Sequence, residues 1–168
     1  MNTNDHLLNS LYKNMITYYA KDPNRIQHFI KVHSFAKLIA ENENLTGEQL
    51  FITEAAAYIH DIGIKPAEQK CGKCGGDLQE LYGPPEAENM LEACGFSEKQ
   101  IQRISYLVGH HHTYMGIDGM DYQILVEADF LVNFYEDNCT KEVIKHTCDK
   151  IFRTETGKWI CQTMFGIE

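Results

Sequence analysis

The stretch EAAAYIHDIG, residues 54–63, decides the fold prediction. Its alanines favour a helix and let other helices approach closely. A histidine and an aspartate then stand side by side just before Gly63, where we expect a left-handed glycine to end the helix. Polar groups are costly to bury unless something binds them. The pair His60-Asp61 therefore needs a binding partner.

Helical patterns dominate the rest of the chain. Asp22-Pro23 is typical of a helix start, and Thr46 with Gln49 and Ser97 with Gln100 predict capping boxes. Helices are expected over residues 12–22, 25–44, 46–63, 84–96, 97–112, 120–137 and 140–152, with one more around Trp159. The segments 64–83 and 113–121 do not read as helical. The sequence thus predicts an all-α, single-domain bundle over residues 1–168, with a core over residues 20–137 and C-terminal helices over residues 138–168.

The composition excludes several classes of protein. The 168 residues carry a formal net charge of −9 with no basic cluster, which argues against a nucleic-acid or anionic-membrane partner. We expect no membrane span, because no run of about 18 apolar residues exists. The N-terminus lacks a secretory pattern, so we expect a cytoplasmic protein with six reduced cysteines.

Two further polar residues lie on apolar helix faces. His28 shares a face with Val32 and Ile39, and Asp129 lies inside the apolar run ILVEADFLVN. Each has a structural alternative: a hydrogen-bonded core histidine for His28, and a buried salt bridge for Asp129. His60-Asp61 has one too, since a positive charge is favoured near a helix C-terminus.

Together the four residues form a mixed nitrogen and oxygen ligand set. His28, His60, Asp61 and Asp129 come from three predicted helices and face inward. Two imidazoles and two carboxylates suit Mn, Fe, Co, Ni or Zn, and four ligands on an octahedral ion leave two positions for water or substrate. We predict one divalent transition metal at this set.

The order His28…His60-Asp61…Asp129, with its apolar surroundings, resembles the HD-domain superfamily of metal-dependent phosphohydrolases. The resemblance spans roughly residues 20–137. It implies an all-helical fold with a central metal cleft, these four residues as metal ligands, and hydrolysis of a phosphate ester or phosphoanhydride, commonly of a nucleotide. Two-metal members carry further histidines after the pair, but none occurs from Ile62 to Gly109. We therefore expect a single metal, although Glu86 or Glu88 could supply an unconventional ligand.

Other residues near the expected cleft are candidates for catalysis or substrate binding. Of His110, His111 and His112, one is expected to face the cleft; we assign His111 to catalysis and His110 and His112 to substrate binding. The alternative is a polar helix terminus. Lys65 is expected beside the site, holding a phosphate oxygen, and a solvated surface lysine is the alternative. Asp61 would also orient or deprotonate the attacking water.

The motif CGKCGG looks like half of a zinc knuckle. Cys71 and Cys74 could hold a second metal, Zn, with ligands from elsewhere; a plain flexible loop is the alternative. The segment 64–83 could cover the substrate and contribute specificity.

We predict a phosphohydrolase that uses a metal-activated water on a small phosphorylated molecule, in particular a nucleotide. A catalytically silent HD-fold module that binds a nucleotide or a metal is the first alternative. An all-α interaction protein is the second, and we leave a homodimer open.

Overall fold

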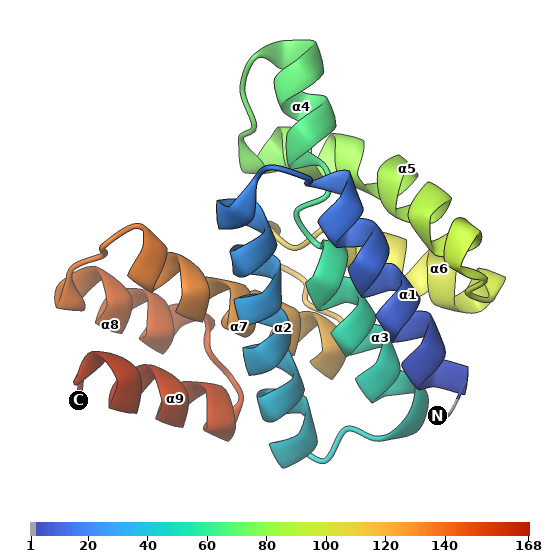
Figure 1. Ribbon diagram of the computed structural model, residues 1–168. Helices are drawn as coiled ribbons and strands as arrows, with labels where there is room; N and C mark the ends of the chain where they lie inside the picture. Colours follow the sequence, from blue (N-terminus) through green and yellow to red (C-terminus); the bar gives the residue numbers. More distant parts are fainter. Residues whose placement is uncertain (1–2) are drawn as a thin grey trace.

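The structure, a computed structural model, describes residues 3–168 and is all-α, as predicted (Figure 1). This part of the chain contains no strand. Its helices are α1 (Thr3–Tyr18), α2 (Pro23–Asn42), α3 (Gly47–Ile59), α4 (Ile64–Cys71), α5 (Gly76–Cys94), α6 (Glu98–Val108), α7 (Met120–Glu136), α8 (Lys141–Ile151) and α9 (Glu155–Phe165).

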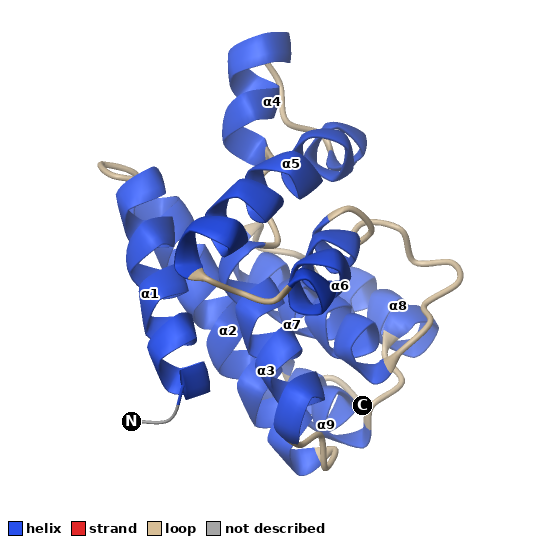
Figure 2. Ribbon diagram, turned by 90° about the vertical axis from the view of Figure 1, so that its right-hand side faces the viewer, coloured by secondary structure: helices blue, strands red, loops and turns tan. Residues whose placement is uncertain are grey.

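Helix α3 forms the centre of the bundle. Every residue from Phe51 to Ile59 is buried, because α1, α2, α6 and α7 pack around this helix (Figure 2). The alanines predicted to allow close packing, residues 55–57, are fully buried. Helix α7 is buried along most of its length and packs on both α2 and α3. The helices that carry the predicted ligands therefore surround one apolar core.

The structure confirms the predicted capping at two of three helix starts. The Asp22 side chain accepts a hydrogen bond from the Arg25 backbone N–H, and Pro23 is the first helical residue. The capping box of Ser97 and Gln100 is present. The capping box predicted at Thr46 is wrong, because its side chain makes no capping hydrogen bond.

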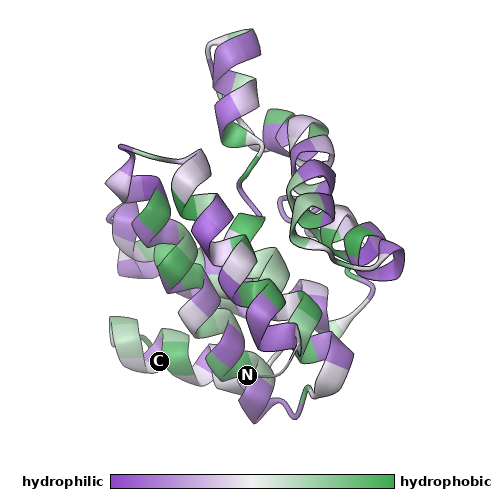
Figure 3. Cartoon of the chain, turned by 45° about the vertical axis from the view of Figure 1, so that its right-hand side comes forward, coloured by the Kyte–Doolittle hydropathy of each residue, from purple (hydrophilic) through white to green (hydrophobic). Residues whose placement is uncertain are grey.

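The prediction that residues 64–83 are non-helical is wrong. Helix α4 begins at Ile64 and ends at Cys71, and Gly72 caps it with a φ of 68° that only glycine adopts easily. Helix α5 then begins at Gly76 and continues through Pro84 and Pro85. Two prolines remove two backbone donors from a helix interior, so packing on α4 and α6 must compensate. The α4 end of this pair projects from the body of the molecule, and its outer turns are mostly hydrophilic (Figure 3).

Gly63 has a different role from the one predicted. Its φ of −69° and ψ of −15° are right-handed, so the expected left-handed helix end is wrong. A Cβ atom at this position would lie 2.4 Å from the Gln79 carbonyl oxygen and 2.7 Å from the Gly83 nitrogen. Glycine is required here because α5 crosses the turn after His60-Asp61 at backbone contact distance.

The C-terminal helices α8 and α9 are joined to α7 by a buried carboxylate. Glu127 is fully buried and accepts hydrogen bonds from the backbone N–H groups of Arg153 at 2.6 Å and Thr154 at 3.0 Å. The Gln123 amide donates to the same carboxylate at 2.7 Å. None of the described helices has both the length and the apolar character needed to cross a membrane.

Candidate metal centre

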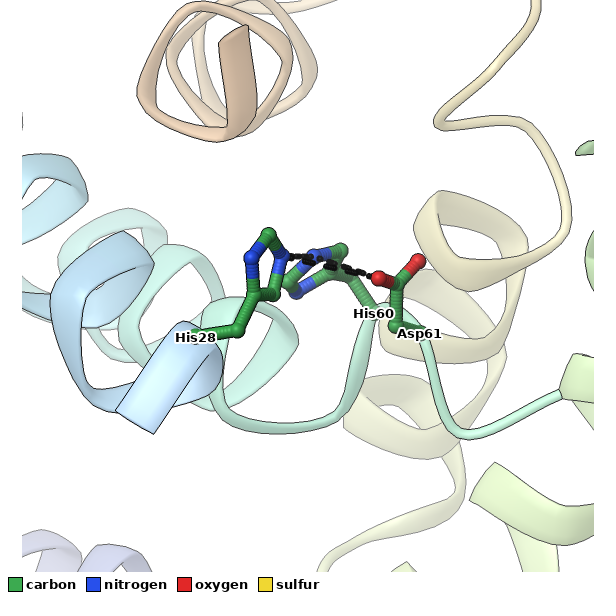
Figure 4. Close-up of side chains that lie close together, drawn as sticks. All are labelled: His28, His60 and Asp61. Atoms are coloured by element: carbon green, nitrogen blue, oxygen red, sulfur yellow. Dashed lines mark hydrogen bonds and ion pairs between the residues drawn. The ribbon is translucent and has the colours of Figure 1, made fainter. Parts of the chain in front are cut away.

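Three helices bring the four predicted ligands to one point. His28 comes from α2, His60 caps the C-terminal end of α3, Asp61 follows in the turn, and Asp129 comes from α7. The Nε2 atoms of His28 and His60 lie 3.2 Å apart. Asp129 Oδ1 lies 3.2 Å from His28 Nε2 and 3.4 Å from His60 Nε2. Asp61 Oδ2 lies 3.5 and 3.6 Å from the same two nitrogens, and Figure 4 shows it turned toward both rings.

These separations fit one divalent cation. Nitrogen and oxygen ligands lie about 2.0–2.2 Å from such an ion, so adjacent ligands are roughly 3 Å apart and opposite ones roughly 4 Å apart. The donor atoms of His28, His60 and Asp61 all lie within 4.8 Å of one another. The spacing is therefore that of ligands around one centre.

Hydrogen bonds fix the orientation of the imidazoles. The Nδ1 atom of His60 donates to the Ala57 carbonyl oxygen at 3.0 Å, and that of His28 donates to the Glu136 carboxylate at 2.8 Å. A neutral imidazole that donates through Nδ1 has a free lone pair on Nε2. Both Nε2 lone pairs then face Asp61 and Asp129, so four acceptor atoms converge. The Asn133 amide donates to Asp129 Oδ1 at 2.9 Å, and the two Nε2 atoms and Asp61 Oδ2 need a cation or added protons.

The pKa values show the same demand for positive charge. Burial alone would lower the pKa of His28, but the hydrogen bond with Asp129 and the charges of Asp61 and Asp129 outweigh it and raise the pKa to about 9. Burial alone would raise the pKa of Asp61, but positive charge on His60 and the hydrogen bond with His111 lower it to about 2. The pKa of Asp129 lies well below its ordinary value because His28 and His60 outweigh its burial. The cluster therefore holds its carboxylates ionised and attracts cations.

The three consecutive histidines lie in three different environments. His111 is fully buried; its Nδ1 donates to the Val108 carbonyl oxygen, and its Nε2 lies 2.9 Å from Asp61 Oδ1. His112 Nε2 lies 2.9 Å from the Gln79 side-chain oxygen. His110 stacks on Tyr106 with ring centroids 4.1 Å apart, away from the ligand cluster.

Asp61, His111 and His112 form a second group of metal-ligating atoms, again within 4.8 Å of one another. Asp61 belongs to both groups. The prediction of a single metal therefore stays a prediction. Glu86 accepts a hydrogen bond from the Tyr18 hydroxyl, and neither it nor Glu88 joins a ligand group among the described residues.

A cavity of about 290 Å³ opens onto the cluster. It is lined by Asn24, Arg25, His28, Phe29, Asp61, Ile64, Gln79, His112, Asn133 and Glu136. Arg25 is the permanently charged cation of this lining, and two hydrogen bonds from its guanidinium to Glu68, of 2.6 and 3.1 Å, hold it in place. The cavity therefore pairs the ligand cluster with a fixed positive charge.

Lys65 lies outside this lining. Its ammonium donates to the Tyr18 carbonyl oxygen at 2.8 Å and lies 4.4 Å from the centre of the Tyr18 ring. The roles in catalysis and substrate binding predicted for Lys65, and the substrate role predicted for His110, gain no support from these positions and stay predictions.

Cys71 and Cys74 lie at the turn between α4 and α5. Cys71 is exposed, with its sulfur 3.7 Å from the Tyr82 hydroxyl, and Cys74 is half-buried. In the described part of the chain, neither thiol belongs to a group of three or more metal-ligating residues. A zinc ion at this pair stays a prediction.

The sequence analysis did not identify three residues of the site. Helical spacing could have indicated two of them. Arg25 precedes His28 by three residues, so the two share a helix face. Glu136 follows Asp129 by seven residues, two helical turns on the same face. Gln79 lies in the segment predicted to be non-helical, where no helical spacing was considered.

No protein-family model and no curated protein matches this chain. It is similar to the crystal structure of a predicted HD superfamily hydrolase from an uncultured Thermotogales bacterium. The similarity covers 96% of this chain and 84% of the other, with 25% sequence identity and a TM-score of 0.64. With a fold shared over nearly its whole length, and the His…His-Asp…Asp set gathered at one point, the chain has the fold and the ligand set of the HD-domain superfamily.

Proposed function

We propose that this protein is a metal-dependent phosphohydrolase that cleaves a phosphate ester or phosphoanhydride, with a nucleotide as its substrate class. The convergence of the Nε2 atoms of His28 and His60 with carboxylate oxygens of Asp61 and Asp129, at 3.2–3.6 Å, carries this proposal. The similar HD superfamily hydrolase supports a hydrolase at the level of the superfamily.

His28, His60, Asp61 and Asp129 would hold one divalent ion, of Mn, Fe, Co, Ni or Zn. Such an ion would lower the pKa of a water toward neutrality and draw charge from a phosphoryl oxygen. Glu136 and the Ala57 carbonyl would keep the two imidazoles oriented through their Nδ1 atoms, at 2.8 and 3.0 Å.

Asp61 is suited to handle the proton of the attacking water. Its Oδ2 faces the imidazoles, while its Oδ1 is held 2.9 Å from His111 Nε2. His111 is itself fixed by the Val108 carbonyl at 2.8 Å. We propose that Asp61 accepts the proton and that His111 orients the carboxylate and stabilises its charge.

Arg25 is the proposed phosphate-binding cation. A guanidinium matches the geometry of phosphate oxygens, and this one lies on the cavity lining one helical turn before His28. Glu68 and Asp22 orient the guanidinium without covering it, since the Arg25 side chain remains 29% exposed. His112 lines the same cavity and could donate to the substrate through Nε2 by exchanging its Gln79 partner.

The test is metal analysis of the purified protein combined with hydrolysis of 4-nitrophenyl phosphate and a nucleotide panel with added Mn or Co. We expect stoichiometric metal and metal-dependent turnover. Asp61→Asn should lower turnover by about 10²–10⁴-fold, the usual contribution of a positioned proton acceptor. Asp149→Asn removes the same charge from an exposed position on α8 and should have no effect.

Two other outcomes would refute the proposal and identify the alternatives. Stoichiometric metal and tight nucleotide binding without turnover would show a binding module. Absence of metal from the purified protein, with no change on His60→Ala, would show that the polar core residues are structural.

A further inference from the structure

A second cavity, larger than the one at the metal centre, lies between α7 and α8. It measures about 590 Å³, against about 290 Å³ at the metal centre. We call it the α7–α8 cavity; its lining includes Tyr114, Met115, Phe130, His146, Lys150 and Arg153. Ligand cavities usually measure about 300–1,000 Å³, so the metal cavity lies at the lower end of this range and the α7–α8 cavity lies within it.

Tyr114, in the lining of the α7–α8 cavity, contacts the lining of the metal cavity. The Tyr114 hydroxyl lies 3.5 Å from Nδ1 of His112, which lines the metal cavity. On α7, Phe130 lines the α7–α8 cavity and directly follows the ligand Asp129, while Asn133, one turn on, lines the metal cavity.

The positive charges of the α7–α8 cavity have no acidic partners in the described part of the chain. Arg153 donates to the carbonyl oxygens of Phe152 at 2.9 Å and Lys150 at 2.6 Å, and pairs with no carboxylate. The other two arginines each pair with two carboxylates. Lys150 forms no ion pair among the described residues either. In a protein of net charge −9, a cluster of unpaired cations favours an anionic ligand.

Apart from Thr147 and His146, the remaining lining is aromatic and apolar. The rings of Tyr114 and Phe130 lie 5.1 Å apart at 47°, and the Met115 side chain is 87% exposed. A flat aromatic group can pack against such a surface. The cavity between α1 and α5 differs, because its charged lining residue is Glu86 and it has no cation to bind a phosphate compound.

We propose that the α7–α8 cavity binds the distal part of the substrate, which contains an aromatic group and a second negative charge. The substrate class is then a phosphate compound with two separated anionic groups: one phosphate at the metal cavity, and the other anion at Lys150 and Arg153. This assignment rests on the proposed function, because the cleaved phosphate is taken to lie at the metal centre.

A matched pair of probes tests the assignment: adenosine 5′-monophosphate and adenosine 3′,5′-bisphosphate, which differ by one anionic group. Hydrolysis with added Mn gives KM and kcat, and titration calorimetry gives Kd, for both compounds. The variant is Lys150→Glu, whose side chain is exposed and makes no ion pair among the described residues. The control is Lys145→Glu, the same charge change on an exposed face of α8 outside the cavity.

For the bisphosphate, we expect Lys150→Glu to raise KM and Kd about tenfold, the factor of one charge-assisted hydrogen bond, with kcat unchanged. For the monophosphate, Lys150→Glu should change KM and Kd by less than about twofold. Lys145→Glu should change neither constant for either compound. Equal effects on both compounds, no effect on either, or the same effect from Lys145→Glu would overturn the assignment. If the wild type binds the bisphosphate through Lys150 but hydrolyses neither compound, the proposed function fails while the anion site stands.

Discussion

Replacing Gly63 by alanine tests the contact between the His60-Asp61 turn and α5. The added Cβ would lie 2.4 Å from the Gln79 carbonyl oxygen and 2.7 Å from the Gly83 nitrogen. Both neighbours are backbone atoms, so no change of side-chain rotamer relieves the overlap. The φ of −69° and ψ of −15° at Gly63 suit alanine, so a loss of stability would report the contact and not backbone strain.

Two effects oppose each other in this variant. Alanine restricts the unfolded chain and should add about 0.4–1 kcal/mol to the free energy of unfolding. Forcing a methyl group into a closely packed interior costs about 1–3 kcal/mol, and rigid backbone neighbours favour the upper part of that range. We expect a net loss of about 1–2 kcal/mol, which would lower Tm by about 2–8 °C for a domain of this size.

Urea unfolding followed by circular dichroism measures the effect. With a slope of about 2 kcal/mol per molar urea, the midpoint should fall by about 0.5–1 M. Gly75→Ala is the matched control: its backbone is extended, and a Cβ there meets only the mobile side chain of Asp77. It should change the free energy of unfolding by less than about 0.5 kcal/mol. If Gly63→Ala is as stable as this control, α5 does not cross the turn at contact distance.

Three further predictions concern the metal centre and the C-terminal helices. First, the apparent affinity for Mn should rise about tenfold per pH unit between pH 6 and 8, because His28, whose pKa is raised to about 9, must lose a proton before it binds the ion. A chelator competition titration measures this affinity, and a flat profile would exclude His28 as a ligand. Second, Glu136→Gln should weaken metal binding about 10–100-fold in the same titration, since the charge that orients His28 Nδ1 at 2.8 Å is lost; unchanged affinity would contradict that role. Third, Glu127→Ala should lower the free energy of unfolding, measured in urea, by about 3 kcal/mol, because buried backbone donors lose their acceptor. The control Glu155→Ala, at a side chain that is 89% exposed, should lower it by less than about 0.5 kcal/mol.

Features determined by neighbouring residues could be predicted from the sequence. The helix start at Asp22-Pro23 and the capping box of Ser97 and Gln100 depend on contacts within one turn, and both are present. The inward positions of His28 and Asp129 followed from apolar residues three and four positions away, and both are buried. Local spacing determines these features, so an amino-acid sequence contains enough to find them.

Features that depend on tertiary packing could not be predicted in this way. Residues 64–83 are rich in glycine and contain no strong helical pattern, yet they form α4 and the first part of α5 because these helices pack on each other and α5 packs on α6. The register of the three histidines also depended on the end of α6. One signal was available: the buried residues Ile104, Leu107 and Val108 continue at helical spacing to His111.

The turn after α3 explains how two adjacent residues can reach one ion. On a continuing helix their side chains would point about 100° apart. Here His60 ends the helix, and the turn carries Asp61 round so that its Oδ2 faces the same nitrogens as Asp129. The Tyr19 hydroxyl, in the residue that follows α1, donates to the Asp61 carbonyl oxygen at 3.1 Å and holds the turn. Gly63 then admits α5, which carries Gln79 to His112. One turn therefore positions both a ligand and a cavity wall, so a displacement of α5 should disturb metal binding and substrate binding together.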